Sequence, residues 1–144
     1  MPSSLGSNST PREAALSSAG LGKLGEQYAA AYLEQLGYRF VAANFTLPVG
    51  RNLRGAVVNA EIDLIAYDQN TLCFIEVKTR TSDWFAPPQA NVDLRKQRQI
   101  ARAAHAYRKL MNLDNDPYRF DVVTVLLSDP DSPQIDLIRN YFAL

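Results

Sequence analysis

Apolar residues recur every three or four positions between residues 21 and 36, which predicts an amphipathic helix. Gly37 follows directly and supplies the C-terminal stop of this helix. Upstream, the run Thr10-Pro11-Arg12-Glu13 has the composition of a helix start, with a cap, a proline at the first helical position and a capping-box glutamate. Residues 1–9 precede that start and are expected to form a flexible tail.

Strand-like runs make up the centre of the chain. Residues 38–45 predict a strand, whereas residues 46–59 predict a loop because a proline and two glycines interrupt them. Two further β-rich runs, at 60–68 and 71–79, are separated only by Gln69-Asn70, and this spacing predicts a β-hairpin.

The second half of the chain predicts one long helix and two strands. These elements occupy residues 93–112, 120–127 and 135–142, and a loop is expected at 83–89. The resulting order, α-β-β-β-α-β-β, without an internal repeat, predicts one α/β domain over residues 10–144, built around a mixed sheet.

The hairpin at residues 60–79 carries the candidate chemistry. A two-residue turn places Asp63 opposite Glu76 and Glu61 opposite Lys78. Because side chains alternate along a strand, these four are expected on one face together with Ile65 and Phe74. The opposite face is expected to be apolar and buried, and consists of Ile62, Leu64, Ala66, Cys73, Ile75 and Val77.

Two carboxylates opposed on neighbouring strands repel each other unless a positive charge lies between them. A divalent cation serves this role better than Lys78 because it prefers oxygen ligands. A metal held by Asp63 and Glu76, beside Lys78, suits hydrolysis of a phosphodiester, in which the lysine orients the water or stabilises charge on the phosphate. The alternative is a solvent-facing strand pair with ordinary ion pairs such as Glu61–Lys78, and a three-residue turn would remove the opposition.

The helix at residues 93–112 has an apolar face and a basic face. The apolar face consists of Ile100, Ala103, Ala104, Tyr107, Leu110 and Met111. The opposite face carries Arg95, Arg98, Arg102, His105 and Lys109, which either solvate the helix or contact phosphates. Lys96 projects from the apolar sector, and it either extends along the helix start or points towards the carboxylates or a bound phosphate.

Other side chains have weaker assignments. Arg80, close to the hairpin site, is a candidate phosphate contact, and Trp84-Phe85 either stacks on a base or packs over the sheet edge. His105 is the only histidine and receives no catalytic role. Cys73, the only cysteine, is expected in the core of a protein from the reducing cytoplasm.

The chain has 144 residues, of which 47% are hydrophobic, so its composition is that of an ordinary globular domain. No apolar run is long enough for a membrane helix, and no secretory signal is visible. Fifteen basic and fifteen acidic residues cancel, but residues 61–83 carry 2 basic and 5 acidic groups while residues 84–112 carry 6 and 1. Neutrality therefore does not exclude nucleic acid, although it predicts weak non-specific DNA binding.

Several ordered motifs together resemble a known family. They are Gly22-Lys23-Leu24-Gly25-Glu26, Ala60-Glu61-Ile62-Asp63-Leu64-Ile65-Ala66, Phe74-Ile75-Glu76-Val77-Lys78-Thr79-Arg80, Lys96 and Arg119-Phe120-Asp121-Val122-Val123. Over about residues 21–142 the chain resembles the bacterial YraN-type family of predicted endonucleases. That family belongs to the restriction-endonuclease-like superfamily and is similar to archaeal Holliday-junction resolvases.

The resemblance implies a restriction-endonuclease-like α-β-β-β-α-β core, here with an extra C-terminal strand, and a metal site of Asp63, Glu76 and Lys78. It also implies that Glu26 completes the site, although the helical pattern alone favours a solvent-exposed Glu26. The sequence departs from the family pattern at Ala60, where a glycine is usual, and in the long segment 46–59.

The expected function is a cytoplasmic Mg²⁺- or Mn²⁺-dependent endonuclease that acts on DNA, with branched or recombination intermediates among the candidate substrates. The expected partners are DNA and a second copy of the chain in a homodimer, and no membrane. Two alternatives remain open: a catalytically silent nuclease-like module that binds DNA or a protein, and a homodimerisation scaffold.

Overall fold

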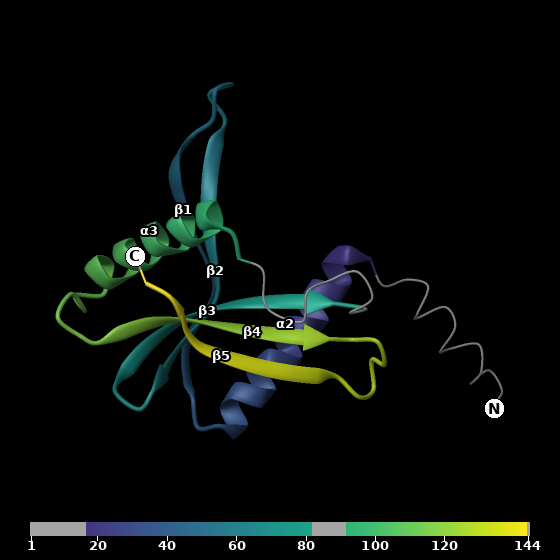
Figure 1. Ribbon diagram of the computed structural model, residues 1–144. Coiled ribbons are helices and arrows are strands. Elements are labelled where there is room, and N and C mark those ends of the chain that lie inside the picture. The colour runs from purple at the N-terminus through teal and green to yellow at the C-terminus, as the bar shows by residue number, and fades with distance from the viewer. Residues whose placement is uncertain (1–16, 82–91, 144) are drawn as a thin grey trace, which may run out of the picture.

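The computed structural model describes residues 17–81 and 92–143. Its elements are α2 (Ser18–Gln35), β1 (Arg39–Arg51), β2 (Val57–Asp68), β3 (Thr71–Arg80), α3 (Leu94–Leu110), β4 (Tyr118–Leu126) and β5 (Gln134–Phe142) (Figure 1). The expected order α-β-β-β-α-β-β is therefore confirmed. The tail at residues 1–9, the helix start at Thr10, the loop at 83–89 and Trp84-Phe85 lie outside the described residues.

The five strands form one mixed sheet in the order β1-β2-β3-β4-β5. Neighbouring strands are antiparallel except β3 and β4, which are parallel and are connected through α3. This arrangement agrees with a restriction-endonuclease-like core. Neither described helix has the length and apolarity needed to span a bilayer.

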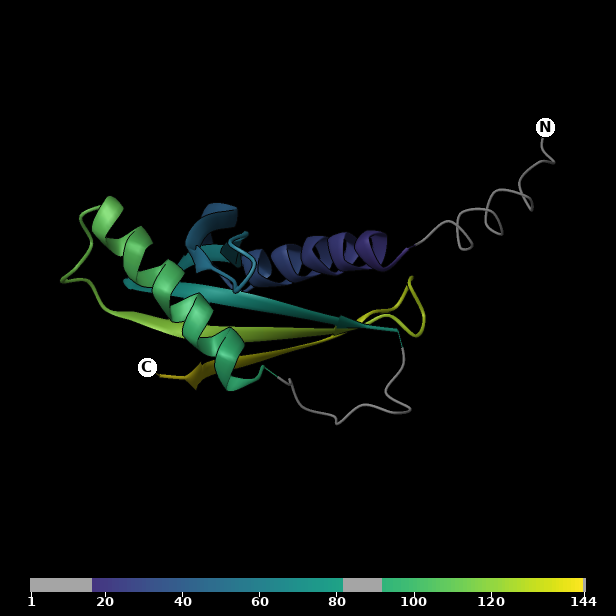
Figure 2. The same ribbon diagram turned by 90° about the horizontal axis from the view of Figure 1, so that it is seen from above.

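The two helices cover opposite faces of the sheet (Figures 1 and 2). Phe74 on β3 packs in one cluster with residues of α3, while its neighbour Ile75 packs with Ala29 and Leu33 of α2. Successive strand residues alternate between two buried layers, as expected for a sheet that is covered on both sides. Cys73 is fully buried in the α2 layer, which confirms its place in the core.

The prediction of a loop at residues 46–59 was largely wrong, because β1 continues to Arg51 and β2 begins at Val57. Pro48 is tolerated because β1 is an edge strand, where a missing N–H need not break the ladder. Gly50 follows a register shift after Pro48, which is characteristic of a bulge. We call residues 46–60 the β1–β2 arm.

The prediction for the apolar face of α3 was also partly wrong. Ile100, Ala103, Ala104 and Tyr107 are buried as expected, but Leu110 and Met111 are 71% and 50% exposed. The helix ends at these residues, and Asn112 adopts a left-handed conformation with φ +59°. That turn brings Leu113 against the α3 cluster, where it takes their place.

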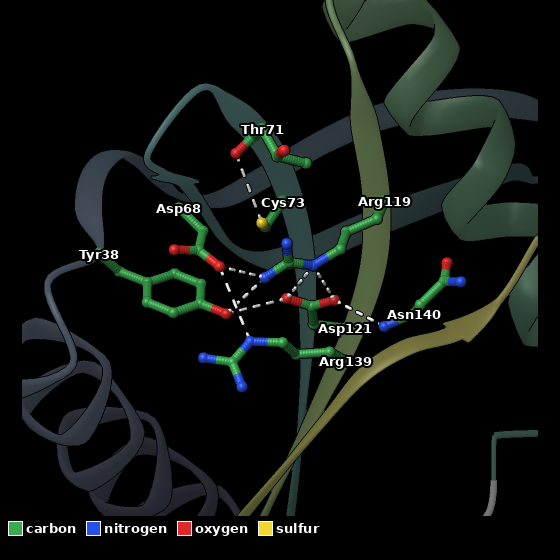
Figure 3. A network of polar contacts seen from close by, with 8 residues as sticks. All are labelled: Tyr38, Asp68, Thr71, Cys73, Arg119, Asp121, Arg139 and Asn140. Carbon is green, nitrogen blue, oxygen red and sulfur yellow. Dashed lines mark hydrogen bonds and ion pairs between the residues drawn. The ribbon is translucent and has the colours of Figure 1, made fainter.

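A buried polar network joins the end of α2 to the far strands (Figure 3). Asp121 on β4 is fully buried, and Arg119 Nε donates hydrogen bonds to its two oxygens at 2.9 and 3.1 Å. Arg119 Nη2 also donates to Asp68 Oδ2 and to Tyr38 Oη, each at 2.7 Å. Burial and the charge of Asp121 raise the pKa of Tyr38 to about 12. The network therefore fixes Tyr38, two residues after the Leu36 cap of α2, against β2 and β4.

Replacing Arg119 with methionine should lower the free energy of unfolding by about 3–5 kcal/mol, because Asp121 would be left buried without its cation. Urea denaturation at neutral pH measures this change. Arg139→Met is the matched control, since Arg139 is 53% exposed and its Nε lies 3.7 Å from Asp68. We expect less than about 1 kcal/mol there, and equal losses in the two variants would contradict a buried, charge-dependent network.

Candidate active site

The strand pairing that defines the site agrees with the two-residue turn. β2 and β3 pair from Asp68 with Thr71 to Leu64 with Ile75. The regular ladder ends there, so the expected pairs Asp63–Glu76 and Glu61–Lys78 are not part of it. Asp63 Oδ2 instead accepts a hydrogen bond from the backbone N–H of Val77 at 2.8 Å. The Asp63 carboxylate therefore points towards β3 and accepts a hydrogen bond from it where the backbone ladder has ended.

The same break changes which face the side chains of β2 occupy. Ile65 packs on the α3 side with Phe74, as expected, and Leu64 packs on the α2 side. Ile62 was expected with Leu64, but it packs in the α3 cluster. The alternation of side chains therefore shifts by one position at Asp63, which the sequence pattern could not show. The α3-side face is also buried core around Ile65, rather than open to solvent.

Glu76 is a buried carboxylate beside Asp63, and each residue is only 7% exposed. Burial and the nearby charge of Asp63 raise the pKa of Glu76 to about 8, against the opposing effects of Lys96 and Lys78. Glu76 Oε1 is buried and has no hydrogen-bond partner among the described residues. The site is therefore a pair of acidic groups whose negative charge is only partly balanced.

Lys96 provides the nearest charge balance. Its Nζ lies 3.9 Å from Glu76 Oε2, so the side chain points towards the carboxylates rather than along the helix. Asp93 caps α3 and accepts a hydrogen bond from the Lys96 backbone N–H at 2.8 Å, which fixes the first helical turn. Lys78 is partly buried on β3, and among the ion pairs of the described residues none joins it to Glu61.

Glu26 reaches the same region from α2. It is partly buried, and its pKa is raised by burial and by the charges of Asp63 and Glu61. The preceding Gly25 permits this approach, because a Cβ there would lie 1.9 Å from Thr79 Oγ1 on β3. The sequence patterns assigned Gly25 no structural role. A glycine beside a glutamate within a helix is the signal that could have indicated close contact with the sheet.

The residues of the basic face of α3 are exposed, whereas Asp63 and Glu76 are buried. The five residues of the expected basic face are exposed: Arg95, Arg98, Arg102, His105 and Lys109. Arg102 Nη2 also donates a hydrogen bond to Val49 O of the β1–β2 arm, a contact that the sequence did not indicate. Arg80 is partly buried at the end of β3.

The donor set fits a hard divalent cation. In the part of the chain that the structure describes, no group of three or more His, Cys, Asp or Glu residues could hold a metal by itself. Mg²⁺ is commonly held by one or two carboxylates, with water and substrate oxygens as its other ligands. Asp63, Glu76 and the unpartnered Glu76 Oε1 supply this minimal set.

The fold and site thus define an α/β protein with a mixed sheet and a buried pair of carboxylates where the pairing of β2 with β3 ends. Residues 25–125 match the uncharacterised protein family UPF0102, and the chain belongs to this family. A UPF0102 protein of Syntrophus aciditrophicus is 43% identical over 85% of this chain and 88% of its own length. Those of Geobacter sulfurreducens and Bacteroides thetaiotaomicron are each 42% identical, over 86% and 85% of this chain and 89% and 91% of theirs.

Replacing Glu76 with glutamine should stabilise the metal-free protein at pH 8–9. A carboxyl whose pKa is raised from 4.5 to about 8 on folding contributes most stability below pH 4.5 and loses it as the pH rises through 8. A neutral glutamine avoids this loss, and we expect a gain of about 2 kcal/mol. The gain should shrink as the pH falls towards 4.5.

Thermal unfolding in EDTA across this pH range measures the effect. The matched control is Glu34→Gln on α2, because Glu34 is exposed and should give no comparable gain. An alkaline loss of stability in Glu76→Gln as large as in the wild type would contradict the assignment of the raised pKa to Glu76.

Proposed function

We propose that this protein is a metal-dependent endonuclease that hydrolyses DNA phosphodiester bonds. The observation that carries the proposal is the buried pair of Asp63 and Glu76, directly beside the ammonium group of Lys96. Burying two carboxylates together is costly, and a divalent cation would offset that cost. Lysines next to such an ion suit the binding of a phosphate.

Each side chain then has a distinct role. Asp63 and Glu76 hold Mg²⁺ or Mn²⁺, which supplies Lewis-acid polarisation of the phosphate and a water of lowered pKa. Lys78, two residues after Glu76 on β3, orients the attacking water or stabilises charge on the phosphate. Glu26 supports the site from α2, where burial and the charges of Asp63 and Glu61 raise its pKa.

The basic face of α3 supports DNA as the substrate. Lys96 lies beside Glu76 at the start of α3, and Arg95, Arg98, Arg102 and Lys109 are exposed along the same helix. Arg80 is a further candidate phosphate contact. A chain of zero net charge gains little from non-specific attraction. We therefore favour substrates distinguished by shape, such as branched or recombination intermediates.

The test incubates the purified protein with a four-way junction, a flap and a linear duplex, in Mg²⁺, Mn²⁺ or EDTA. We expect cleavage only with metal, and we expect Asp63→Asn and Glu76→Gln each to slow it roughly 100-fold or more. The matched controls are Asp136→Asn and Glu34→Gln, which remove exposed carboxylates on β5 and α2 and should leave the rate unchanged.

Two results would contradict the proposal. The first is that no condition gives cleavage, and the second is that Asp63→Asn cuts as fast as Asp136→Asn. DNA binding that persists without any hydrolysis would instead support a catalytically silent DNA-binding module.

A further inference from the structure

The β1–β2 arm extends beyond the sheet (Figure 1). Because β2 pairs with β3 only from Leu64 onward, residues 57–62 of β2 are paired with β1 and not with β3. The arm is thus the outer part of a two-stranded ribbon whose base, at Ile62, lies next to Asp63 in the chain. Nothing in the metal site requires this extension, so its length calls for a separate explanation.

The tip of the arm has a defined conformation. Arg51 Nη1 donates a hydrogen bond to Gly55 O at 2.6 Å, which closes the turn. Asn52 Oδ1 accepts hydrogen bonds from the backbone N–H groups of Arg54 and Ala56 at 2.9 and 3.0 Å. Leu53, between the two arginines, is fully exposed. A held turn that presents an apolar side chain between two cations is suited to contact with a partner.

The arm and the exposed side of α3 are rich in cations. Arg51 and Arg54 are the only charged residues at positions 46–60, and the exposed charged residues within α3 are Arg95, Arg98, Arg102 and Lys109. The two elements touch, since Arg102 of α3 donates to Val49 O. They also line a common hollow of about 360 Å³, formed by Leu47, Pro48, Val49, Ala101, Arg102 and His105. In a chain of zero net charge, this concentration of cations favours a polyanion.

The arm is shorter than one turn of duplex DNA. Asp63 and Leu53 are ten positions apart, but only residues 57–63 are strand and residues 52–56 lie in the turn, so the extended part spans about 20 Å. One turn of B-DNA is about 34 Å long, and its major groove accommodates a two-stranded β-ribbon. Apolar side chains flanked by arginine are also typical of protein segments that wedge into DNA.

We propose that the β1–β2 arm binds a groove of duplex DNA within one helical turn of the phosphate held at Asp63 and Glu76. This inference rests on the proposed function for its cutting site, but the contact itself needs no hydrolysis. Arg51 and Arg54 contact phosphates on the two sides of the groove, and Leu53 contacts the bases or sugars between them. The arm thereby requires intact duplex on one side of the cut.

Binding is measured by fluorescence anisotropy with a labelled duplex of about 30 base pairs, in EDTA so that no cleavage occurs. The double variant Arg51→Gln/Arg54→Gln should bind roughly 10-fold more weakly than the wild type. For this variant the slope of log K against log salt concentration should become less steep by about 2, because two phosphate contacts are lost. Leu53→Ser should weaken binding without changing this salt dependence.

The matched control is Arg39→Gln/Arg139→Gln, which removes two exposed arginines near the opposite end of β2 from the arm. Its affinity and salt dependence should equal those of the wild type. A second readout uses Leu53→Cys labelled with a photo-crosslinker, which reacts selectively because the native Cys73 is buried. We expect cross-links to the duplex from this position.

Equal weakening of the arm and control variants, or unchanged binding by the arm variant, would overturn the inference. So would an arm variant that loses self-association in a size measurement but retains its DNA affinity, because a second copy would then be the occupant. DNA binding that depends on the arm, without any cleavage, would support the inference about the arm and contradict the proposed nuclease activity. Cleavage together with DNA binding that does not depend on the arm would support the nuclease activity and overturn the inference about the arm.

Discussion

The hydrogen bond from the Val77 amide to the Asp63 carboxylate organises the acidic site and the point where β2 separates from β3. A side chain takes over as acceptor at the point where the ladder of β2 with β3 ends, so β2 can leave the sheet and pair with β1 alone. The same contact holds Asp63 next to Glu76 in a buried position, where burial and the charge of Asp63 raise the pKa of Glu76 to about 8. One local departure from regular pairing thus creates both the acidic site and the arm beside it.

The two helices complete the site from opposite faces of the sheet. α2 approaches β3 closely because Gly25 has no side chain to meet Thr79, and this closeness brings Glu26 under the influence of Asp63. The Arg119 network holds Tyr38, just after the end of α2, and so helps to fix the helix that carries Glu26. α3 contributes the opposite charge, since its capped first turn directs Lys96 towards Glu76.

The order of the elements and the hairpin register could be predicted from the sequence because they depend on local patterns. The two-residue turn at Gln69-Asn70 fixes which residues face each other, and the period of α3 separates its buried face from its basic face. The arm could not be predicted, because Pro48 and Gly50 indicate a loop unless the strand is known to be an edge. The place of Ile62 was missed since the shift of alternation arises from the Asp63 contact between strands.

We propose that Asp63 and Glu76 form a site for a divalent cation. The most direct test titrates the purified protein with Mn²⁺ and measures free and bound ion by electron paramagnetic resonance, without DNA. We expect about one bound Mn²⁺ per chain, with affinity lowered roughly 10-fold or more in Asp63→Asn and unchanged in Asp136→Asn. Absence of binding to the wild type, or equal binding by Asp63→Asn, would contradict this proposal.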